Sequence, residues 1–269
     1  MKIKLYIVTY KRPDDLRSTI QDILNSDIMD HNVQLYVVNN HTEFHLDEEY
    51  TDKVTVLHNV LRPNWSTGHL SRNYNEIFLH GIQDLNNPDC DLLIHTHDDN
   101  TFSQNWFSQL LEFHKTYNFI TFSQGCGLCS YTPEAIKTIG MWDERFCTIG
   151  YHEGDYFLRA LRYNKDKVSI NDPHQGREFN PLPHVVTKKS GTGQNFAHQQ
   201  SFKNYSICRN LWELKWPGLR DGGWLPEFYH NVPKPAIPMY IMYPYFEKHI
   251  TDVEEKYFKG IDVDGRPFL

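Results

Sequence analysis

The stretch LLIHTHDDNT, residues 92–101, decides the fold. Its apolar start is typical of a short buried strand, and two adjacent carboxylates, Asp98 and Asp99, follow directly. In open α/β sheets, ligands bind outside the carboxyl ends of the strands. Carboxylate oxygens at that position suit Mg²⁺ or Mn²⁺, which bridge phosphate groups. The alternative is that Asp98, Asp99 and Asn100 cap a following helix, because Asp and Asn are preferred capping residues.

The first part of the chain alternates between predicted strands and helices. Strands are predicted over Lys2–Thr9, Val33–Val38, Lys53–Asn59 and Asp91–His97, and helices between Pro13 and Leu24, through Ile77 and Ile82, and over Phe102–Tyr117. This alternation predicts a Rossmann-like, mainly parallel sheet with flanking helices, because parallel strands are joined by helical crossovers. We therefore expect residues 1–117 to form the nucleotide-binding half of an α/β domain.

The pattern is less regular after residue 117, and residues 118–195 are expected to form the second half of the same domain. Strands are predicted over Phe119–Ser123 and Gly127–Tyr131, and helices over Pro133–Ile139, capped by Thr132 and ended at Gly140, and over Glu153–Tyr163. Residues 171–194 are rich in Pro and Gly and predict a long functional loop. Residues 196–269 are predicted to be a helical, then Pro- and aromatic-rich extension that packs on the domain or joins a homo-oligomer.

Composition excludes several classes of protein. A formal net charge of −7 argues against a nucleic-acid binder. No apolar run is long enough to span a bilayer, and the N-terminus does not resemble a signal peptide. Five cysteines do not form a disulfide framework, and Cys126 and Cys129, although spaced like a redox or zinc pair, have no second pair and are interpreted as packed thiols. These features predict a cytoplasmic protein.

Six motifs occur in an order that is more specific than any one of them. They are IVTYKRPDDL (7–16), VVNNHT (37–42), NWSTGHLSRN (64–73), HTHDDN (95–100), GLCSYTPEAIKTIGMWDERF (127–146) and GYHEGDYFLRALRYN (150–164). Together they resemble the GT-A fold glycosyltransferases, particularly the large inverting family that includes SpsA-like enzymes. The resemblance covers about residues 3–165, and later only NLWELKWPG (210–218) is similar to that family.

The resemblance implies a set of donor-binding residues at the strand ends. Thr9, Tyr10 and Arg12 would hold the nucleotide base. Asn39 stands where the family has an Asp that accepts a hydrogen bond from the base, so the identity of the base stays open. Arg72 would reach the base or support the carboxylates, with a structural ion pair as its alternative.

The resemblance also implies a metal and a catalytic base. Asp98 would contact the ribose or a metal-bound water, and Asp99 would coordinate Mn²⁺ or Mg²⁺ at the diphosphate. Glu153 would be the general base, with an acidic start of a helix as its alternative. His152 replaces the acid that the family has before this position. His184 is a weaker candidate for a late metal ligand.

Three further residues are expected near the transferred sugar or its acceptor: Trp142, Asp143 and Asp155. For Asp143 the alternative is a helix or turn cap, and for Asp155 it is the same acidic helix start. The loop Lys188–Gly193 is a candidate to close over the diphosphate, or else is a solvated loop.

The sequence therefore predicts a metal-dependent, inverting glycosyltransferase with a nucleotide-sugar donor, UDP-sugar favoured, and a glycan or glycoconjugate acceptor. One alternative is a sugar- or nucleotide-binding module without turnover, which the replacements Asn39 and His152 keep open. The other is a non-haem iron enzyme using His97, Asp99 and a distal His such as His174. That chemistry usually needs a double-stranded β-helix, which the strand–helix alternation does not predict.

Overall fold

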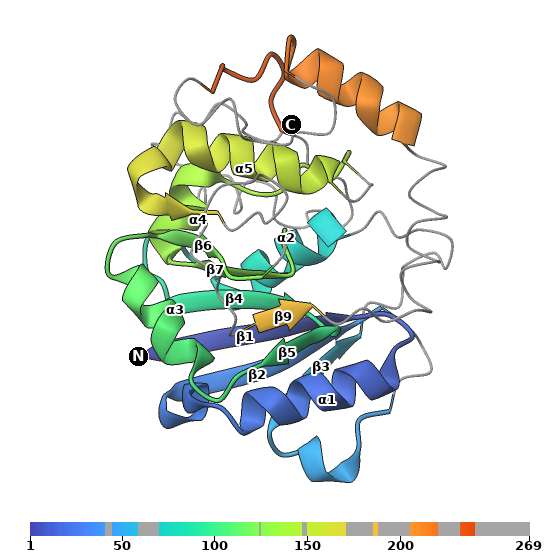
Figure 1. The fold of residues 1–269 in the computed structure, drawn as a ribbon, viewed down its shortest axis with the longest axis vertical. Helices are drawn as coiled ribbons and strands as arrows, with labels where there is room; N and C mark the ends of the chain where they lie inside the picture. The colour runs from blue at the N-terminus through green and yellow to red at the C-terminus, as the bar shows by residue number, and fades with distance from the viewer. Residues whose placement is uncertain are drawn as a thin grey trace.

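The computed structural model describes residues 1–40, 45–58, 70–123, 125–146, 150–170, 185–187, 205–219 and 232–239. In these parts of the chain a seven-stranded sheet has the strand order β3-β2-β1-β4-β7-β6-β8, and β5 and β9 form a separate two-stranded sheet. Figure 1 shows α1 towards one end of the molecule and α4 and α5 towards the other, with the large sheet between them. The prediction of an α/β fold with a mainly parallel sheet is confirmed.

Four parallel strands form one side of the large sheet. They are β1 (Lys2–Thr9), β2 (Asn32–Asn39), β3 (Val54–His58) and β4 (Leu92–His97). The register pairs Thr9 with Asn39 and Asn39 with His58, while Val8 pairs with His97. The carboxyl ends of all four strands therefore lie level at one edge of the sheet.

Helices bury apolar side chains against both faces of this sheet. One face of β1, with Ile3, Leu5 and Ile7, packs in a core with α1 (Pro13–Leu24) and α3 (Trp106–His114). Its other face, with Tyr6 and Val8, packs in a second core. That second core contains residues of α2 (Leu70–Gly81), α4 (Pro133–Ile139) and α5 (Tyr151–Asn164). Strand alternation thus gives β1 two buried faces, as in a doubly covered parallel sheet.

The second half of the domain adds strands of mixed direction. β7 (Leu128–Tyr131) is antiparallel to β4 and to β6 (Phe119–Thr121), and β6 is parallel to β8 (Val168–Ser169). The short 3₁₀ helices are η1 (Asp27–Asp30), η2 (Glu48–Tyr50) and η3 (Lys165–Lys167). At α4, the Thr132 side chain accepts a hydrogen bond from the Ala135 amide, and Gly140 ends the helix at φ 84°. Both predicted ends of this helix are confirmed.

The region after β4 differs from its prediction. The helix predicted from Phe102 begins only at Trp106, because residues Asn100–Phe102 form β5, which pairs with β9 (Val185–Thr187). The amides at the start of α3 donate to Asp27 of η1, Phe107 N to Oδ1 at 3.0 Å and Ser108 N to Oδ2 at 2.8 Å. The alternative in which Asp98, Asp99 and Asn100 cap this helix is therefore wrong.

The helix of residues 205–215 is joined to the domain by buried charge. Lys215 is fully buried, and its Nζ lies 2.7 Å from Asp143 Oδ2 and 2.7 Å from Asp155 Oδ1 in α5. Trp216 Nε1 donates to the same Asp155 oxygen at 2.9 Å. Figure 1 shows this helix beyond α5, at the end of the molecule. This described part of the C-terminal extension thus packs on the domain, while the predicted boundary near residue 195 stays a prediction.

In the described part of the chain, no helix is both long enough and apolar enough to cross a membrane. The region 171–194 is described only at Val185–Thr187.

We predict that Lys215→Met lowers the free energy of unfolding by about 3–5 kcal/mol, because it leaves two buried carboxylates with one cation fewer. Urea unfolding of the full chain measures this change. Lys115→Met is the matched control, since the Lys115 side chain is 69 % exposed and pairs with the exposed Glu112. Equal free energies of unfolding for the two variants would contradict the structural role of Lys215.

Candidate functional site

The site is built at the junction of β1 and β4, where the backbone pairing continues one residue past β4. The Asp98 amide donates to the Val8 carbonyl at 3.2 Å. The Thr9 hydroxyl, at the end of β1, donates to Asp98 Oδ2 at 2.7 Å. Asp98 is only 5 % exposed, so this bond and the surrounding burial set the position of its carboxylate.

The turn after β4 is held by α1 and by its own side chains. The Thr19 hydroxyl, in α1, is shared between the carbonyl oxygens of Asp98 and Asn100, each at 2.8 Å. The side-chain nitrogen of Asn100, Nδ2, donates to Thr96 Oγ1 at 2.8 Å and to the Gly127 carbonyl at 2.6 Å. These contacts turn the chain sharply, so that Asp98 and Asp99 stand at the edge of the sheet.

Arg12 provides positive charge to the two carboxylates. Its Nη1 atom lies 3.0 Å from Asp99 Oδ2 and 3.8 Å from Asp98 Oδ1. Burial raises the pKa of the Asp98 carboxyl to about 7, although the Thr9 hydrogen bond and the Arg12 charge act in the opposite direction. The guanidinium of Arg12 therefore does not fully neutralise the negative charge of the two little-exposed carboxylates.

Asp99 has the property expected of a metal ligand. Its Oδ1 atom is buried and has no hydrogen-bond partner among the described residues, while Oδ2 accepts from Arg12. A buried carboxylate oxygen without a partner is costly, and a divalent cation would satisfy it. The all-oxygen donor set of Asp98 and Asp99 fits Mg²⁺ or Mn²⁺.

The turn that joins β1 to α1 carries the predicted base-binding residues. Lys11 has φ 58°, the left-handed region that residues with a side chain seldom adopt. The Tyr10 backbone also makes a hydrogen bond to the Asp98 carboxylate. The predicted cluster of Thr9, Tyr10 and Arg12 is therefore brought to Asp98 by one strained turn.

The end of β2 places two asparagines beside this turn. The Asn39 side-chain nitrogen lies 3.1 Å from His58 Nδ1, so His58 at the end of β3 orients that amide. The Asn40 amide and side chain both donate to the Thr9 carbonyl, at 3.2 and 3.3 Å. Asn39 thus lies in the same row of strand ends as Thr9. Arg72 lies in the first turn of α2, and its charge acts on Glu76 in the next turn.

Glu153 lies in the first turn of α5 in a cradle of backbone amides. Cys126 N donates to Oε1 and Gly150 N donates to Oε2, each at 3.0 Å. Burial acts to raise the pKa of Glu153, but the His152 charge and the bonds to Cys126 outweigh it, so this pKa lies below its usual value. The carboxylate is therefore ionised at neutral pH, the state that a general base needs.

A chain of side-chain contacts runs from β4 to the helix that carries Glu153. His97 Nε2 lies 2.6 Å from the Tyr74 hydroxyl, which lies 3.2 Å from Cys126 Sγ. Cys126 Sγ in turn lies 3.4 Å from His152 Nε2. Neither a role for Tyr74 nor this contact of Cys126 is predicted from the sequence. No local pattern reveals them, because the four residues come from four separate segments.

Trp142, Asp143 and Asp155 lie in the buried interior. Trp142 is fully buried and stacks on Tyr156, with ring centroids 4.1 Å apart. Asp143 binds Lys215 and Arg145, and its Oδ1 accepts from the Arg145 amide at 3.2 Å. That last bond matches the alternative of a turn cap.

Both carboxylate oxygens of Asp155 are also paired within the fold. One of its oxygens accepts from Arg159 Nε at 3.1 Å, and the other faces Lys215 and Trp216. Buried carboxylates whose oxygens are already paired are not offered to a sugar. The geometry thus favours structural roles for Trp142, Asp143 and Asp155 over the sugar contacts expected from the sequence.

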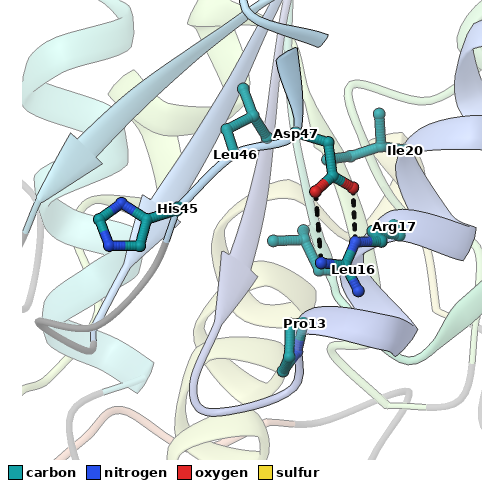
Figure 2. Close-up of a pocket in the computed structure, with 7 residues that line it drawn as sticks. All are labelled: Pro13, Leu16, Arg17, Ile20, His45, Leu46 and Asp47. Atoms are coloured by element: carbon teal, nitrogen blue, oxygen red, sulfur yellow. Dashed lines mark hydrogen bonds and ion pairs between the residues drawn. The ribbon is translucent and has the colours of Figure 1, made fainter. Parts of the chain in front are cut away.

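A shallow hollow lies next to the first turn of α1. Figure 2 shows it between Pro13 and Leu16 on one side and residues 45–47 on the other. Arg17 and Asp47 form a two-bond ion pair there, with N–O distances of 2.5 and 3.3 Å. None of the predicted donor-binding residues lines this hollow, and we assign it no role.

Some predicted residues lie outside the described parts of the chain. They are His184, His174, the loop Lys188–Gly193, the loop Asn64–Gly68 and most of the segment after residue 219.

The fold is similar to that of known glycosyltransferases. Mannosyltransferase PcManGT from Pyrobaculum calidifontis, solved with GDP-Man and Mn²⁺, matches with a TM-score of 0.50 and 10 % identity, over 71 % of this chain and 58 % of that one. This chain thus matches less than two thirds of that enzyme's length. The chain has a GT-A-type fold, as the sequence motifs predicted.

A second structure, S. aureus TarS residues 1–349 in complex with UDP, matches with a TM-score of 0.49 and 10 % identity, over 82 % of this chain and 67 % of that one. At this TM-score the likeness adds no support. No protein-family model matches the sequence, and no curated protein matches it.

We predict that Gly125→Ala displaces the Glu153 carboxylate. Gly125 has φ 56°, and an added Cβ would meet Glu153 Oε1 at 2.5 Å. Gly218→Ala is the matched control, because Gly218 has φ 80° but no atom of the described residues lies within 4 Å of an added Cβ. Backbone strain of about 1–2 kcal/mol is common to both variants. Urea unfolding should show a larger loss for Gly125→Ala, and equal losses would contradict the close approach of Glu153.

Proposed function

We propose that this protein is a metal-dependent glycosyltransferase that moves a sugar from a nucleotide-sugar donor to a hydroxyl of a glycan or glycoconjugate, with inversion. The observation that carries the proposal is the buried Asp99 Oδ1 oxygen without a hydrogen-bond partner among the described residues, at the carboxyl edge of a GT-A-type sheet. That edge is where open α/β sheets bind nucleotides.

The donor side of the site is assigned from the contacts at the strand ends. Thr9, Tyr10 and Asn39 lie around the base, and Arg12 positions Asp99 through the bond of 3.0 Å. Asp98 faces the ribose, held by the Thr9 hydroxyl at 2.7 Å. Asp99 would hold a divalent ion, Mn²⁺ or Mg²⁺, which would supply positive charge to the leaving diphosphate. The mannosyltransferase of similar fold was solved with Mn²⁺ and GDP-Man, which supports a metal and a nucleotide-sugar for this chain.

The acceptor side of the proposal depends on Glu153. An acceptor hydroxyl oxygen attacks the anomeric carbon, the bond from that carbon to the diphosphate oxygen breaks, and the hydroxyl proton passes to the Glu153 carboxylate. A single displacement of this kind inverts the configuration at the anomeric carbon. The amides of Cys126 and Gly150 keep the carboxylate oriented and ionised for this step.

The structure also bears on the two alternatives. For the iron enzyme, the α/β sheet is not the usual scaffold of that chemistry. A binding module without turnover would keep the donor site and lose the need for an ionised Glu153. The Glu153 carboxylate is buried, is held by backbone amides and has a lowered pKa, and these properties favour the enzyme.

The first prediction concerns the metal. Wild-type protein is expected to bind one of UDP, GDP, dTDP or CMP tightly with Mn²⁺ and weakly with EDTA, with UDP favoured. Asp99→Asn should weaken the Mn²⁺-dependent binding by about 100-fold or more, since it removes a metal-coordinating charge. Titration calorimetry measures both. Asp14→Asn is the matched control, because the Asp14 side chain is 94 % exposed on α1. Binding that is equal with Mn²⁺ and with EDTA would reject the metal.

The second prediction concerns the base. Glu153→Gln should lower turnover by about 10²–10⁴-fold and leave nucleotide affinity unchanged, because it removes the proton acceptor but keeps the shape. Release of the nucleoside diphosphate from the preferred donor, with a panel of acceptors, measures turnover. Glu112→Gln, exposed on α3, is the control. An unchanged rate in Glu153→Gln would reject this assignment, whereas wild-type protein that binds the donor without any turnover would favour the binding module.

A further inference from the structure

Three side chains of metal-binding type meet on the acceptor side of the site. Cys126 Sγ, His152 Nε2 and a carboxylate oxygen of Glu153 all lie within 4.8 Å of one another. Cys126 precedes β7, while His152 and Glu153 lie in the first turn of α5. Cys126 is a free thiol and is 1 % exposed, and His152 is 3 % exposed.

The distance between Cys126 and His152 matches a tetrahedral metal site. Ligand bonds of about 2.3 Å to sulfur and 2.0–2.1 Å to nitrogen place the two ligand atoms about 3.6 Å apart in a tetrahedral zinc site. Cys126 Sγ and His152 Nε2 are 3.4 Å apart. The Glu153 carboxylate oxygen, within 4.8 Å of both atoms, would be the third ligand, and a water molecule can take the fourth position.

The chemistry of the donor atoms separates this cluster from Asp98 and Asp99. One sulfur, one imidazole nitrogen and one carboxylate oxygen suit zinc, whereas hard oxygen ligands alone suit Mg²⁺ and Mn²⁺. The backbone amides that hold Glu153 use one lone pair of each oxygen, which leaves lone pairs for a metal. The Tyr74 hydroxyl, 3.2 Å from Cys126 Sγ, is positioned to donate to a thiolate.

We propose that Cys126, His152 and Glu153 form a zinc-binding site distinct from the donor metal at Asp99. Zinc binding replaces the thiol proton of Cys126, which passes to the solvent. A further consequence rests on the proposed function: zinc bound to Glu153 occupies the carboxylate that takes the acceptor proton. Zn²⁺ is therefore expected to inhibit transfer without displacing the donor.

The test measures zinc binding directly, by competition with a chromophoric chelator on the full chain. We expect one equivalent of Zn²⁺ to bind to wild-type protein, and Cys126→Ser and His152→Gln to weaken it by about 100-fold. Cys90→Ser is the matched control, since Cys90 is also buried but contacts Gly81 and not the cluster. Co²⁺ in place of Zn²⁺ should show a thiolate charge-transfer band that Cys126→Ser lacks.

Control variants separate this site from the donor site. Asp99→Asn should retain the Co²⁺ thiolate band, because its change lies outside the cluster. Zinc affinity that is equal in wild type and Cys126→Ser, or a missing Co²⁺ band in wild type, would overturn the zinc site. Far-ultraviolet circular dichroism and unfolding curves show whether each variant is folded, and His152→Gln gives a second test if Cys126→Ser does not fold.

The inhibition is tested at saturating Mn²⁺, with each rate divided by that variant's own rate without zinc. Wild type and Cys90→Ser should lose activity at the zinc concentration that fills the site, and Cys126→Ser should need about 100-fold more. Zinc that binds the cluster without slowing transfer would overturn the inhibition. Zinc binding in a protein with no transferase activity would instead count against the proposed function and leave the zinc site supported.

Discussion

The pairing of β1 with β4 is the constraint on which the rest of the site depends. Its parallel register places His97 beside Val8, and the Asp98 amide then donates to the Val8 carbonyl at 3.2 Å. A shift of one residue would exchange the side chains that β4 presents to the two cores, so the register is strongly determined. Given this register, the Thr9 hydroxyl meets Asp98, and the turn that follows β1 brings Arg12 to Asp99. The donor side is thus a consequence of strand pairing.

Buried carboxylates have two different electrostatic environments in this molecule. Near the C-terminal extension, Asp143 and Asp155 share Lys215 and each also pairs with an arginine, so three cations face two carboxylates. The pKa of Asp143 falls to about 2 there even though burial opposes this. At the strand ends, within the described part of the chain, Arg12 faces two carboxylates, and burial raises the pKa of Asp98 to about 7. Carboxylates with enough positive charge around them stabilise a fold, whereas two carboxylates that face one cation have a capacity to bind another.

The proposed acceptor side combines the proposed base, Glu153, with the cluster around Cys126. Gly125 has no side chain where Glu153 Oε1 approaches, and the next residue, Cys126, supplies both an amide to that carboxylate and a sulfur to His152. His152 stands where the family that the sequence resembles has an acid. An imidazole at this position attracts the Glu153 carboxylate and can also bind a metal. The proposed base and the proposed zinc ligands therefore share Glu153.

The sequence by itself determined the α/β class, the first strands and both ends of α4, because strand periodicity and capping residues are local properties. It also determined the edge of the sheet where Thr9, Asn39 and Asp98 meet, because strand direction follows from the order of the elements. Only the tertiary structure decided which polar groups are already paired with other groups of the protein. It showed that Asp27 caps α3, that Asp143 and Asp155 are paired in the interior, and that Cys126 meets His152. The partners in these contacts are 26 to 80 residues apart in the chain, and no local pattern encodes such a distance.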